Sequence, residues 1–370
     1  MLAFGAGHAL AATIEVDDNK VECKKAPFTS IQAAVTAATP GDSIKVCPGT
    51  YNEQVRITKD NLKLESRNPQ AATIKAPPVM TSPKAIVYID GATGVTVRDF
   101  VISGPGGGPC DSLEYGVLVG GSASDPSTGA EIRHNRITRI QDNPAGGCQN
   151  GNAVQVGRDF VGLVGSADVV DNTIDAYQKT GVVVDGTGSS ARVRDNTITG
   201  LGSVSFIAQN GVQVSRSALA DVEHNTISDN LYAPQTVAST GVLVFDANPA
   251  SEISHNTILR NDEGVYLDGQ DGGTVSHNES SHNTFDGFGV IDATNMTVDH
   301  NVAEGNGFDG VYATADSSEN SIAFNHLSDN AEHDCHDDSN GPYAPGVANH
   351  WFNNKGVTEN KPGLCQGEKP

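Results

Sequence analysis

The stretch from Ile253 to Glu279 reads ISHNTILRNDEGVYLDGQDGGTVSHNE, and the pattern aliphatic-x-His-Asn occurs near both of its ends. The Asn of this pattern recurs along the chain at intervals of 37, 24, 29, 31, 22, 23 and 24 residues. His precedes this Asn in five of the eight copies, Asp in two and Phe in one; the copies are Asn135, Asn172, Asn196, Asn225, Asn256, Asn278, Asn301 and Asn325. A near-constant interval of this length indicates an array of one short structural unit.

Each unit contains two short apolar runs. The first run begins with an aliphatic residue three positions before the Asn, and another apolar residue usually follows two positions after the Asn. This alternation is typical of a strand. The second run usually starts with Gly-Val, as at Gly181, Gly211 and Gly241. Each unit therefore has at least two strands of about five residues and no segment long enough for a helix.

A unit of 22 to 24 residues with strands but no helix is too small to bury its own apolar face. Stacking such units buries that face in one continuous core, so the sequence predicts an all-β parallel solenoid. Leucine-rich repeats have a similar period, but they need leucines at fixed offsets, and Leu is scarce here.

The recurrent Asn is expected to turn the chain in a left-handed conformation and to bond the Asn one coil away. A second Asn follows five residues later in several units and predicts a parallel ladder at the next corner. Its members are Asn230, Asn261, Asn283, Asn306 and Asn330.

The repeats resemble those of the right-handed parallel β-helix family within the pectin-lyase-like superfamily, over roughly residues 28 to 365. The segments FTSIQAAV at 28–35, PGDSIKV at 40–46 and PGTYNE at 48–53 are similar to the N-terminal part of many such proteins. The resemblance implies a single-stranded right-handed parallel β-helix with a short N-terminal capping helix. Such a cap is needed because an uncovered solenoid end exposes apolar side chains and strand edges.

The repeat runs through most of the chain without a linker, which favours one elongated domain. We divide it into the tail of a secretory signal at 1–12, a β-helix with its N-terminal cap at 13–334 and a disulfide-closed C-terminal cap at 335–370. The export signal and six cysteines favour three disulfides and a secreted protein without a membrane span. Many connectivities are possible, and proximity in the sequence favours Cys23 with Cys47, Cys110 with Cys148, and Cys335 with Cys365.

The net charge of −22 is distributed unevenly. Between Asp221 and Asp338 there are 22 acidic residues and a single base, Arg260. Seven of the eleven arginines lie between Glu131 and Arg216. So acidic a chain lacks the dense basic stripe that a phosphate backbone requires, which argues against nucleic acid as a partner. The acidic half either binds Ca²⁺ as a cofactor or is a solvated face.

Alternate residues of a strand that is buried on one side face outward. If the valines of the Gly-Val strands point inward, two outward rows of side chains lie on neighbouring coils, with arginines directly after them. Polar groups with aromatic flanks suit a sugar chain, whose rings stack on aromatic side chains. We predict catalytic roles for Asp185, Arg158 and Arg216, and substrate binding by Gln155, Gln213, Tyr266, Asp268 and Tyr312.

In polysaccharide lyases and uronate epimerases of this superfamily, a base removes the proton beside a uronate carboxylate, which Arg, Lys or Ca²⁺ neutralises. The resemblance therefore implies an enzyme acting on an acidic polysaccharide or cell-surface glycan, with Arg158 or Arg216 near the carboxylate and Asp185 or a His in proton transfer. Two alternatives stay open: a non-catalytic β-helix that binds glycan, and a structural or adhesive surface protein. We expect a monomer.

A second candidate site is the run HDCHDDS at 333–339. Part of it resembles the Asp-Pro-His-Asp motif of alginate epimerases, although Cys335 replaces the Pro and the run follows the last coil. A cap sealed by Trp351, a metal site and a catalytic site are the three interpretations. The predicted metal ligands are Asp334, His336, Asp337 and Asp338.

Overall fold

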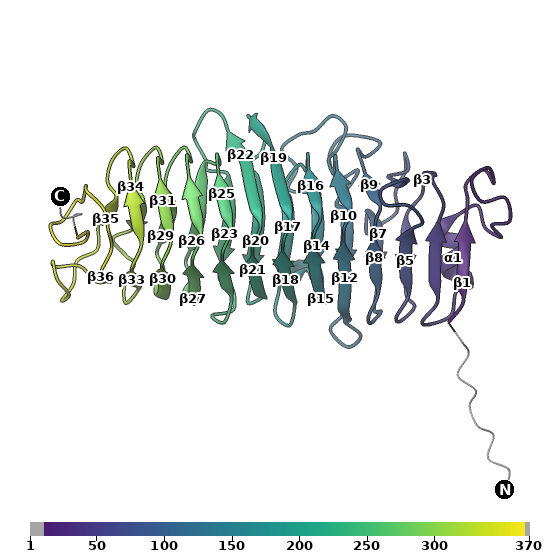
Figure 1. Cartoon of the computed structure of the whole chain (residues 1–370), viewed down its shortest axis with the longest axis horizontal. Helices are drawn as coiled ribbons and strands as arrows, with labels where there is room; N and C mark the ends of the chain where they lie inside the picture. The colour runs from purple at the N-terminus through teal and green to yellow at the C-terminus, as the bar shows by residue number, and fades with distance from the viewer. Residues whose placement is uncertain (1–10, 367–370) are drawn as a thin grey trace, which may run out of the picture.

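The computed structural model describes residues 11–366 and consists of strands stacked along one long axis (Figure 1). Three parallel sheets run along the described part of the chain and form the faces of a β-helix, so the predicted all-β solenoid is confirmed. The helical segments among these residues are α1 (Ile31–Ala37) and the short 3₁₀ turn η1 (Asp159–Val161). Neither has the length and hydrophobicity to cross a membrane. Residues 1–10 of the predicted signal tail lie outside the described residues.

Sheet A contains the aliphatic residues that precede each recurrent Asn. Its strands, in stacking order, are β1 (Thr13–Val16), β2 (Ser43–Val46), β5 (Lys63–Ser66), β8 (Thr96–Arg98), β12 (Ser127–Arg133), β15 (Leu163–Val170), β18 (Ser190–Arg194), β21 (Leu219–Glu223), β24 (Glu252–Ser254), β27 (Asp271–Ser276), β30 (Thr294–Asp299), β33 (Ser321–Ala323) and β36 (His350–Phe352). The short strand β11 (Gly121–Ser122) pairs antiparallel with β15.

Sheet B contains the strands that come directly after the recurrent Asn in the sequence of each coil. Its strands are β3 (Gly49–Asn52), β6 (Ala72–Lys75), β9 (Val101–Ser103), β13 (Arg136–Thr138), β16 (Thr173–Asp175), β19 (Thr197–Val204), β22 (Thr226–Tyr232), β25 (Thr257–Leu259), β28 (Glu279–Ser281), β31 (Val302–Glu304) and β34 (His326–Ser328).

Sheet C contains the Gly-Val runs. Its strands are β4 (Val55–Ile57), β7 (Ala85–Ile89), β10 (Tyr115–Val119), β14 (Asn152–Val156), β17 (Thr180–Asp185), β20 (Asn210–Ser215), β23 (Thr240–Phe245), β26 (Glu263–Asp268), β29 (Phe288–Ile291), β32 (Val311–Ala313) and β35 (Cys335–Asp337).

The core is filled by aligned apolar rows, one from each sheet. In sheet C a Gly stands before most of the inward valines, because a Cβ on Gly211, for example, would lie 2.6 Å from the carbonyl oxygen of Gly241. The inward valines of this sheet are in register and have no solvent exposure: Val117, Val154, Val182, Val212, Val242 and Val265. This continuous burial is the main stabilising term of a solenoid.

The predicted Asn ladders are confirmed. Asn225 Oδ1 accepts hydrogen bonds from the backbone and side-chain amides of Asn196, both at 3.0 Å, and Asn225 Nδ2 donates to the Val193 carbonyl oxygen. Each ladder Asn is buried, and the row extends to Asn354. The left-handed conformation, however, belongs to the residue before the Asn, such as His224 with φ of 56°. That turn directs the Asn side chain inward, where it reaches the next coil.

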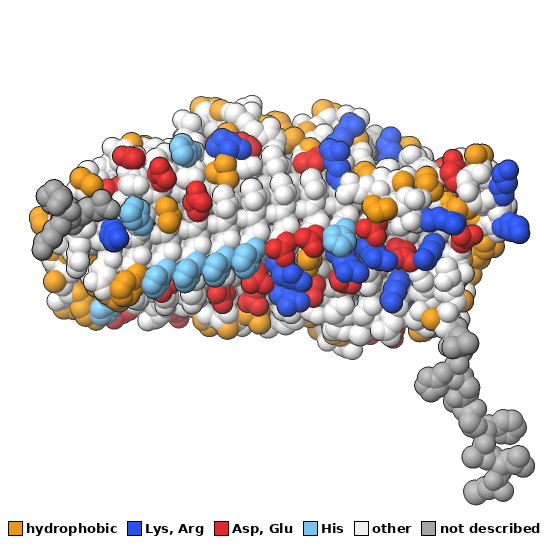
Figure 2. Space-filling model, viewed as in Figure 1, with side chains coloured by type: hydrophobic (Ala, Val, Ile, Leu, Met, Phe, Trp, Pro, Cys, Tyr) orange, Lys and Arg blue, Asp and Glu red, His pale blue; other side chains and the backbone are white. Residues whose placement is uncertain are grey.

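The residues in the left-handed position point outward and form a ladder of their own. The imidazoles of His224, His255, His277 and His300 stack in sequence, with ring centroids 4.9 to 5.1 Å apart. They form the long pale-blue row in Figure 2. Phe324 continues the stack beyond His300. The His beside the Asn is therefore a repeated corner residue, as the sequence indicates.

Both ends of the β-helix are closed as predicted. Glu53 accepts the free backbone N–H groups of Ile31 and Gln32 at 2.8 and 2.9 Å, and α1 buries Ile31 against the first coils. At the other end Trp351 lies in β36 and its Nε1 donates to Asp337 at 2.6 Å. The helix α1 therefore covers one end of the core, and Trp351 packs at the other.

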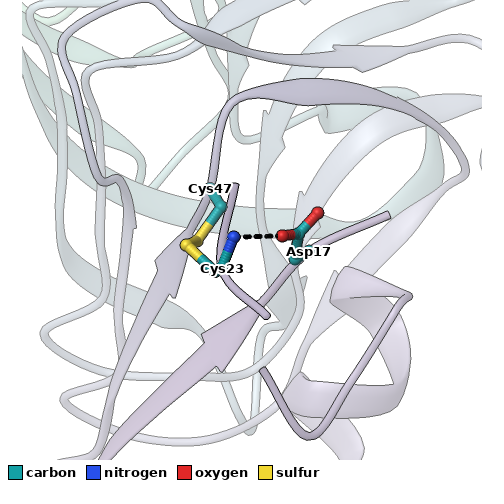
Figure 3. A group of neighbouring side chains, drawn as sticks. All are labelled: Asp17, Cys23 and Cys47. Atoms are coloured by element: carbon teal, nitrogen blue, oxygen red, sulfur yellow. Dashed lines mark hydrogen bonds between the residues drawn. A yellow bond between two sulfur atoms is a disulfide. The ribbon is translucent and has the colours of Figure 1, made fainter. Parts of the chain in front are cut away.

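The three predicted disulfides are also present, joining Cys23 to Cys47, Cys110 to Cys148, and Cys335 to Cys365. Three disulfides fit an oxidising compartment outside the cytoplasm. Figure 3 shows the first one beside Asp17, which accepts the backbone N–H of Cys23. Because both sulfurs are used in the bond, this group offers no thiolate to a metal.

Candidate functional site

The outer face of sheet C has the side-chain rows that the period of two predicts. One row contains, in strict register, Leu118, Gln155, Val183, Gln213, Leu243, Tyr266, Gly289, Tyr312 and His336. A second row contains Asp185, Ser215, Phe245, Asp268 and Ile291. Most of these residues differ from coil to coil, in contrast to the inward valines.

A cavity of about 270 Å³ opens on this face over β14, β17 and β20, and we call it the basic pocket. The structure brings all three predicted catalytic residues, Arg158, Asp185 and Arg216, to its wall. The predicted ligands Gln155 and Gln213 line it as well, together with Phe160 and Lys179.

Arg158 keeps its donor capacity free for a ligand, whereas Arg216 also pairs with Asp185. The guanidinium of Arg158 lies 5.4 Å from the ring centroid of Tyr115 and pairs with no carboxylate in the described part of the chain. The guanidinium of Arg216 lies 4.3 Å from the ring centroid of Phe160, and its buried Nε faces Asp185 Oδ1 at 3.3 Å. Aromatic rings fix both guanidinium groups without consuming their N–H donors.

Asp185 holds the wall of the basic pocket together. Its Oδ2 accepts the backbone N–H of Asp159 at 3.0 Å, which fixes the η1 loop. Its Oδ1 accepts from Ser215 Oγ at 2.7 Å and lies 3.3 Å from Arg216 Nε. The side chain is only 3% exposed. Because its oxygens are engaged with the protein, the structure favours a positioning role over the predicted proton transfer.

Lys179 is the ionisable residue of the pocket that the sequence pattern did not predict. Its Nζ donates to the Ala208 carbonyl oxygen at 2.7 Å, and burial lowers its pKa to about 8. A lysine with such a pKa is partly neutral at physiological pH and can accept a proton. One signal was available in the sequence, since no other Lys occurs between residues 85 and 354.

The other predicted substrate-binding residues lie further along the same face. Tyr266 and Asp268 are on β26 and Tyr312 is on β32, so β26 is three strand steps from β17, or about 14 Å at the usual strand spacing. Burial and the nearby Asp268 raise the pKa of Tyr266 to about 12, and burial with Asp292 raises the pKa of Asp268. These residues therefore lie on the same face as the basic pocket but outside it.

The predicted metal set at the C-terminus is not assembled. Asp334 Oδ2 accepts the backbone N–H of Val357 at 2.7 Å, and its Oδ1 ends the second Asn ladder by accepting from Asn330. Asp337 is buried and accepts from Trp351 and Ser339. Both carboxylates face inward because they accept hydrogen bonds from N–H groups at the last coil. Of the four predicted ligands, only His336 and Asp338 contact each other, with Nε2 of His336 3.1 Å from Oδ1 of Asp338.

A different set of groups gathers beside His336, and we call it the His–Asp cluster: Asp309, His333, His336 and Asp338. His336 Nδ1 lies 2.7 Å from Asp309 Oδ2, and His333 Nδ1 lies 3.3 Å from Asp309 Oδ1. Burial alone would lower the pKa of His336, but the bonds to Asp309 and Asp338 raise it to about 9.

A row of buried carboxylates leads from sheet C to this cluster. Glu263, Asp286 and Asp309 occupy equivalent positions on successive coils, and each is at most 7% exposed. Burial and the charge of Asp286 raise the pKa of Glu263 well above its usual value. Burial raises the pKa of Asp286 to about 7. Neighbouring carboxyl groups with raised pKa values are common at functional sites, so this end of the outer face of sheet C is a second candidate site.

A larger hollow, of about 640 Å³, lies on the outer face of sheet A over β12, β15, β18 and β21. Small residues such as Gly129 and Ala167 form much of its wall, and Arg192 is paired with Asp168 at 2.8 Å. Paired surface charges of this kind are typical of a solvated face. The basic pocket, with its free donors, is the stronger site.

Comparison with known proteins agrees with this architecture. Residues 160–327 match the family model described as the right handed beta helix region. A search of curated proteins finds no matching sequence. The chain therefore has a right-handed parallel β-helix fold.

Several solved structures share the fold. The GH136 lacto-N-biosidase of Eubacterium ramulus aligns with a TM-score of 0.58 at 13% identity, covering 86% of this chain and 64% of that protein. XylC in complex with xylose gives 0.53 at 13% identity, covering 85% of this chain and 75% of the other. The A-module of the mannuronan C-5 epimerase AlgE6 from Azotobacter vinelandii gives 0.53 at 14% identity, covering 92% and 94%. At these identities the likeness is one of fold.

Proposed function

We propose that the protein is a secreted enzyme that binds an acidic polysaccharide along sheet C and removes the proton beside a uronate carboxylate. The basic pocket is the observation that carries this proposal. Arg158, Lys179 and Arg216 surround one cavity in a chain whose net charge is −22. A carboxylate on a sugar ring fits such a site because guanidinium groups bind both carboxylate oxygens and amides bind hydroxyls.

Each group in the pocket has a role in this reaction. Lys179, which burial makes less basic, accepts the proton from the carbon beside the carboxylate. Arg158 and Arg216 stabilise the negative charge that then develops on the carboxylate oxygens. Asp185 positions Arg216 and the η1 loop.

Two outcomes can follow proton removal. If the C–O bond to the next sugar breaks, a carbon–carbon double bond forms, the departing oxygen takes a proton from solvent, and the enzyme is a lyase. If a proton returns from the opposite face of the ring, the enzyme is an epimerase.

The fold comparisons support a carbohydrate substrate. The similar structures include a lacto-N-biosidase, a complex with xylose and a mannuronan C-5 epimerase. The outer face of sheet C also offers Tyr266 and Tyr312 beyond the pocket, where aromatic rings suit further sugar units. The disulfides suit an extracellular polymer as the target.

The test is to incubate the protein with alginate, pectate, hyaluronan and heparan, with and without Ca²⁺. Ultraviolet absorbance detects the unsaturated product of a lyase, and proton NMR detects epimerised units. We expect turnover of at least one polymer, and loss of turnover in Lys179→Met. Binding without turnover would favour the non-catalytic glycan-binding alternative, and the absence of both binding and turnover would overturn the proposal.

A further inference from the structure

We propose that Asp309, His333 and His336 bind one divalent transition-metal ion of the zinc class at the C-terminal end of sheet C. The nitrogen and oxygen atoms that these side chains offer all lie within 4.8 Å of one another. Asp309 precedes β32, whereas His333 and His336 come from the next coil, so the strand stacking itself brings the groups together. This site is separate from the basic pocket and does not depend on the proposed polysaccharide reaction.

The two nitrogens of His336 have different partners, as in a metal-binding histidine. Nδ1 faces Asp309, and Nε2 lies 3.1 Å from Asp338 Oδ1 on the opposite side of the ring. Tyr312 packs on the imidazole with ring centroids 4.8 Å apart, and its hydroxyl donates to Asp338 at 3.3 Å. A carboxylate on the far nitrogen fixes the tautomer and orientation of a metal-bound imidazole.

The charges around the cluster call for a cation. Glu263, Asp286 and Asp309 are buried on successive coils, and no Lys or Arg occurs between residues 261 and 354 of the sequence. Asp286 and Asp309 are linked only through a backbone amide, since Asp309 N donates to Asp286 Oδ1 at 2.9 Å. Within the described residues, Glu263 and Asp286 are buried without a Lys or Arg partner, which is costly, and a divalent ion bound at the neighbouring Asp309 offsets part of that cost.

The donor types select the class of metal. Two imidazoles and one carboxylate match the ligands of zinc and its neighbours, whereas Ca²⁺ requires six to eight oxygens. The site also lies beside the Cys335–Cys365 disulfide. A metal bound here would tie the last coils together at the point where the stack loses its next neighbour.

The experiment is calorimetric titration of the metal-free protein with ZnCl₂, with Co²⁺ absorption in the visible range as the readout of ligand type. We expect one Zn²⁺ per chain, no displacement by equimolar Ca²⁺, and loss of binding in His333→Ala and His336→Gln. Asp338→Asn should weaken binding by about tenfold to a hundredfold, the usual effect of losing the carboxylate behind a histidine ligand. Circular dichroism checks that each variant is folded, and His333 is the safer position because its side chain is 31% exposed.

His255→Ala is the matched control, because His255 stacks in the exposed ladder at the other corner of the coil. This variant should bind Zn²⁺ as the unmodified protein does. The proposal is overturned if no Zn²⁺ binds, if His333→Ala and His336→Gln bind normally, if His255→Ala abolishes binding, or if Ca²⁺ displaces Zn²⁺. None of these outcomes depends on polysaccharide turnover.

Discussion

The Asn corner between sheets A and B and the outer face of sheet C belong to the same coils but use the repeat in opposite ways. At the corner, Asn196, Asn225 and Asn256 make the same hydrogen bonds on every coil. On the outer face, the aligned positions on three adjacent strands are Val183, Gln213 and Leu243. An interaction between coils requires the same residue one step away, whereas a ligand imposes no such requirement. A residue that is repeated at the same position on successive coils therefore indicates a structural role. Aligned positions where the residue changes from coil to coil are candidates for function.

The sharpest test of this contrast is Lys179→Met, which changes a residue that no other coil repeats. We expect turnover to fall by about a hundredfold to ten-thousandfold, the usual contribution of a general base. Stability should not fall, because the substitution removes a charge that burial disfavours. Steady-state kinetics on the polymer identified above measures the effect, with the exposed Lys63→Met as control. Retained turnover would remove Lys179 from the reaction.

Asn256→Ala changes a repeated residue and should act on stability instead. Its side-chain Nδ2 donates to the Val222 carbonyl oxygen and to Asn278 Oδ1, and its Oδ1 accepts the backbone N–H of Asn225. We expect a loss of about 3 kcal/mol, because several buried partners are left unsatisfied. Urea unfolding gives the value. The exposed Asn52→Ala on β3 should change stability by less than about 0.5 kcal/mol, and equal effects at the two positions would contradict the role of the ladder.

Arg158→Gln tests the anion-binding part of the pocket. The loss of a charge-assisted hydrogen bond should raise KM by about tenfold to a hundredfold. Stability should hardly change, since Arg158 pairs with no carboxylate in the region that the structure describes. Comparison of KM and kcat for an acidic polymer and for its methyl ester measures the effect. An equal loss on both polymers would show that Arg158 does not bind the carboxylate.

The pH dependence provides a smaller effect on the same site. Lys179 must be neutral to accept a proton, and its pKa is about 8, so turnover should rise about tenfold per pH unit below 8 and level off above it. The free energy of unfolding should also rise with pH. Between pH 8 and the ordinary lysine pKa of 10.5, Lys179 binds more protons in the unfolded state than in the folded state, so stability increases across that window. Both trends should be absent from Lys179→Met, as pH profiles of kcat and of urea unfolding would show.

The smallest effect is expected for His255→Ala in the exposed ladder. The stacked rings contribute about 1 kcal/mol or less beyond their buried area, and solvent replaces their polar contacts. Urea unfolding should therefore show a change below that of Asn256→Ala. A larger loss at His255 would mean that the outward ladder, and not the inward one, holds the corner.

The sequence by itself determined the coil. The spacing of the Asn residues, the Gly-Val runs and the cysteine pairs predicted the solenoid, its inward rows, its ladders and its three disulfides. Each of these features repeats or pairs locally, because one coil hydrogen-bonds only to the next. The register of Gln155, Asp185 and Gln213 followed from the same rule, and it placed them correctly beside Arg158 and Arg216.

Only the tertiary structure decided what these side chains do. Asp185 accepts a hydrogen bond from the η1 loop, and Lys179 enters the pocket from a coil corner. Asp334 and Asp337 turn inward. Asp309 instead contacts His336, which is 27 residues away in the sequence. Burial and the exact partners of a polar group depend on atoms contributed by neighbouring coils and by loops of unequal length. A periodic pattern contains no information about those atoms, because they are the places where the period is broken.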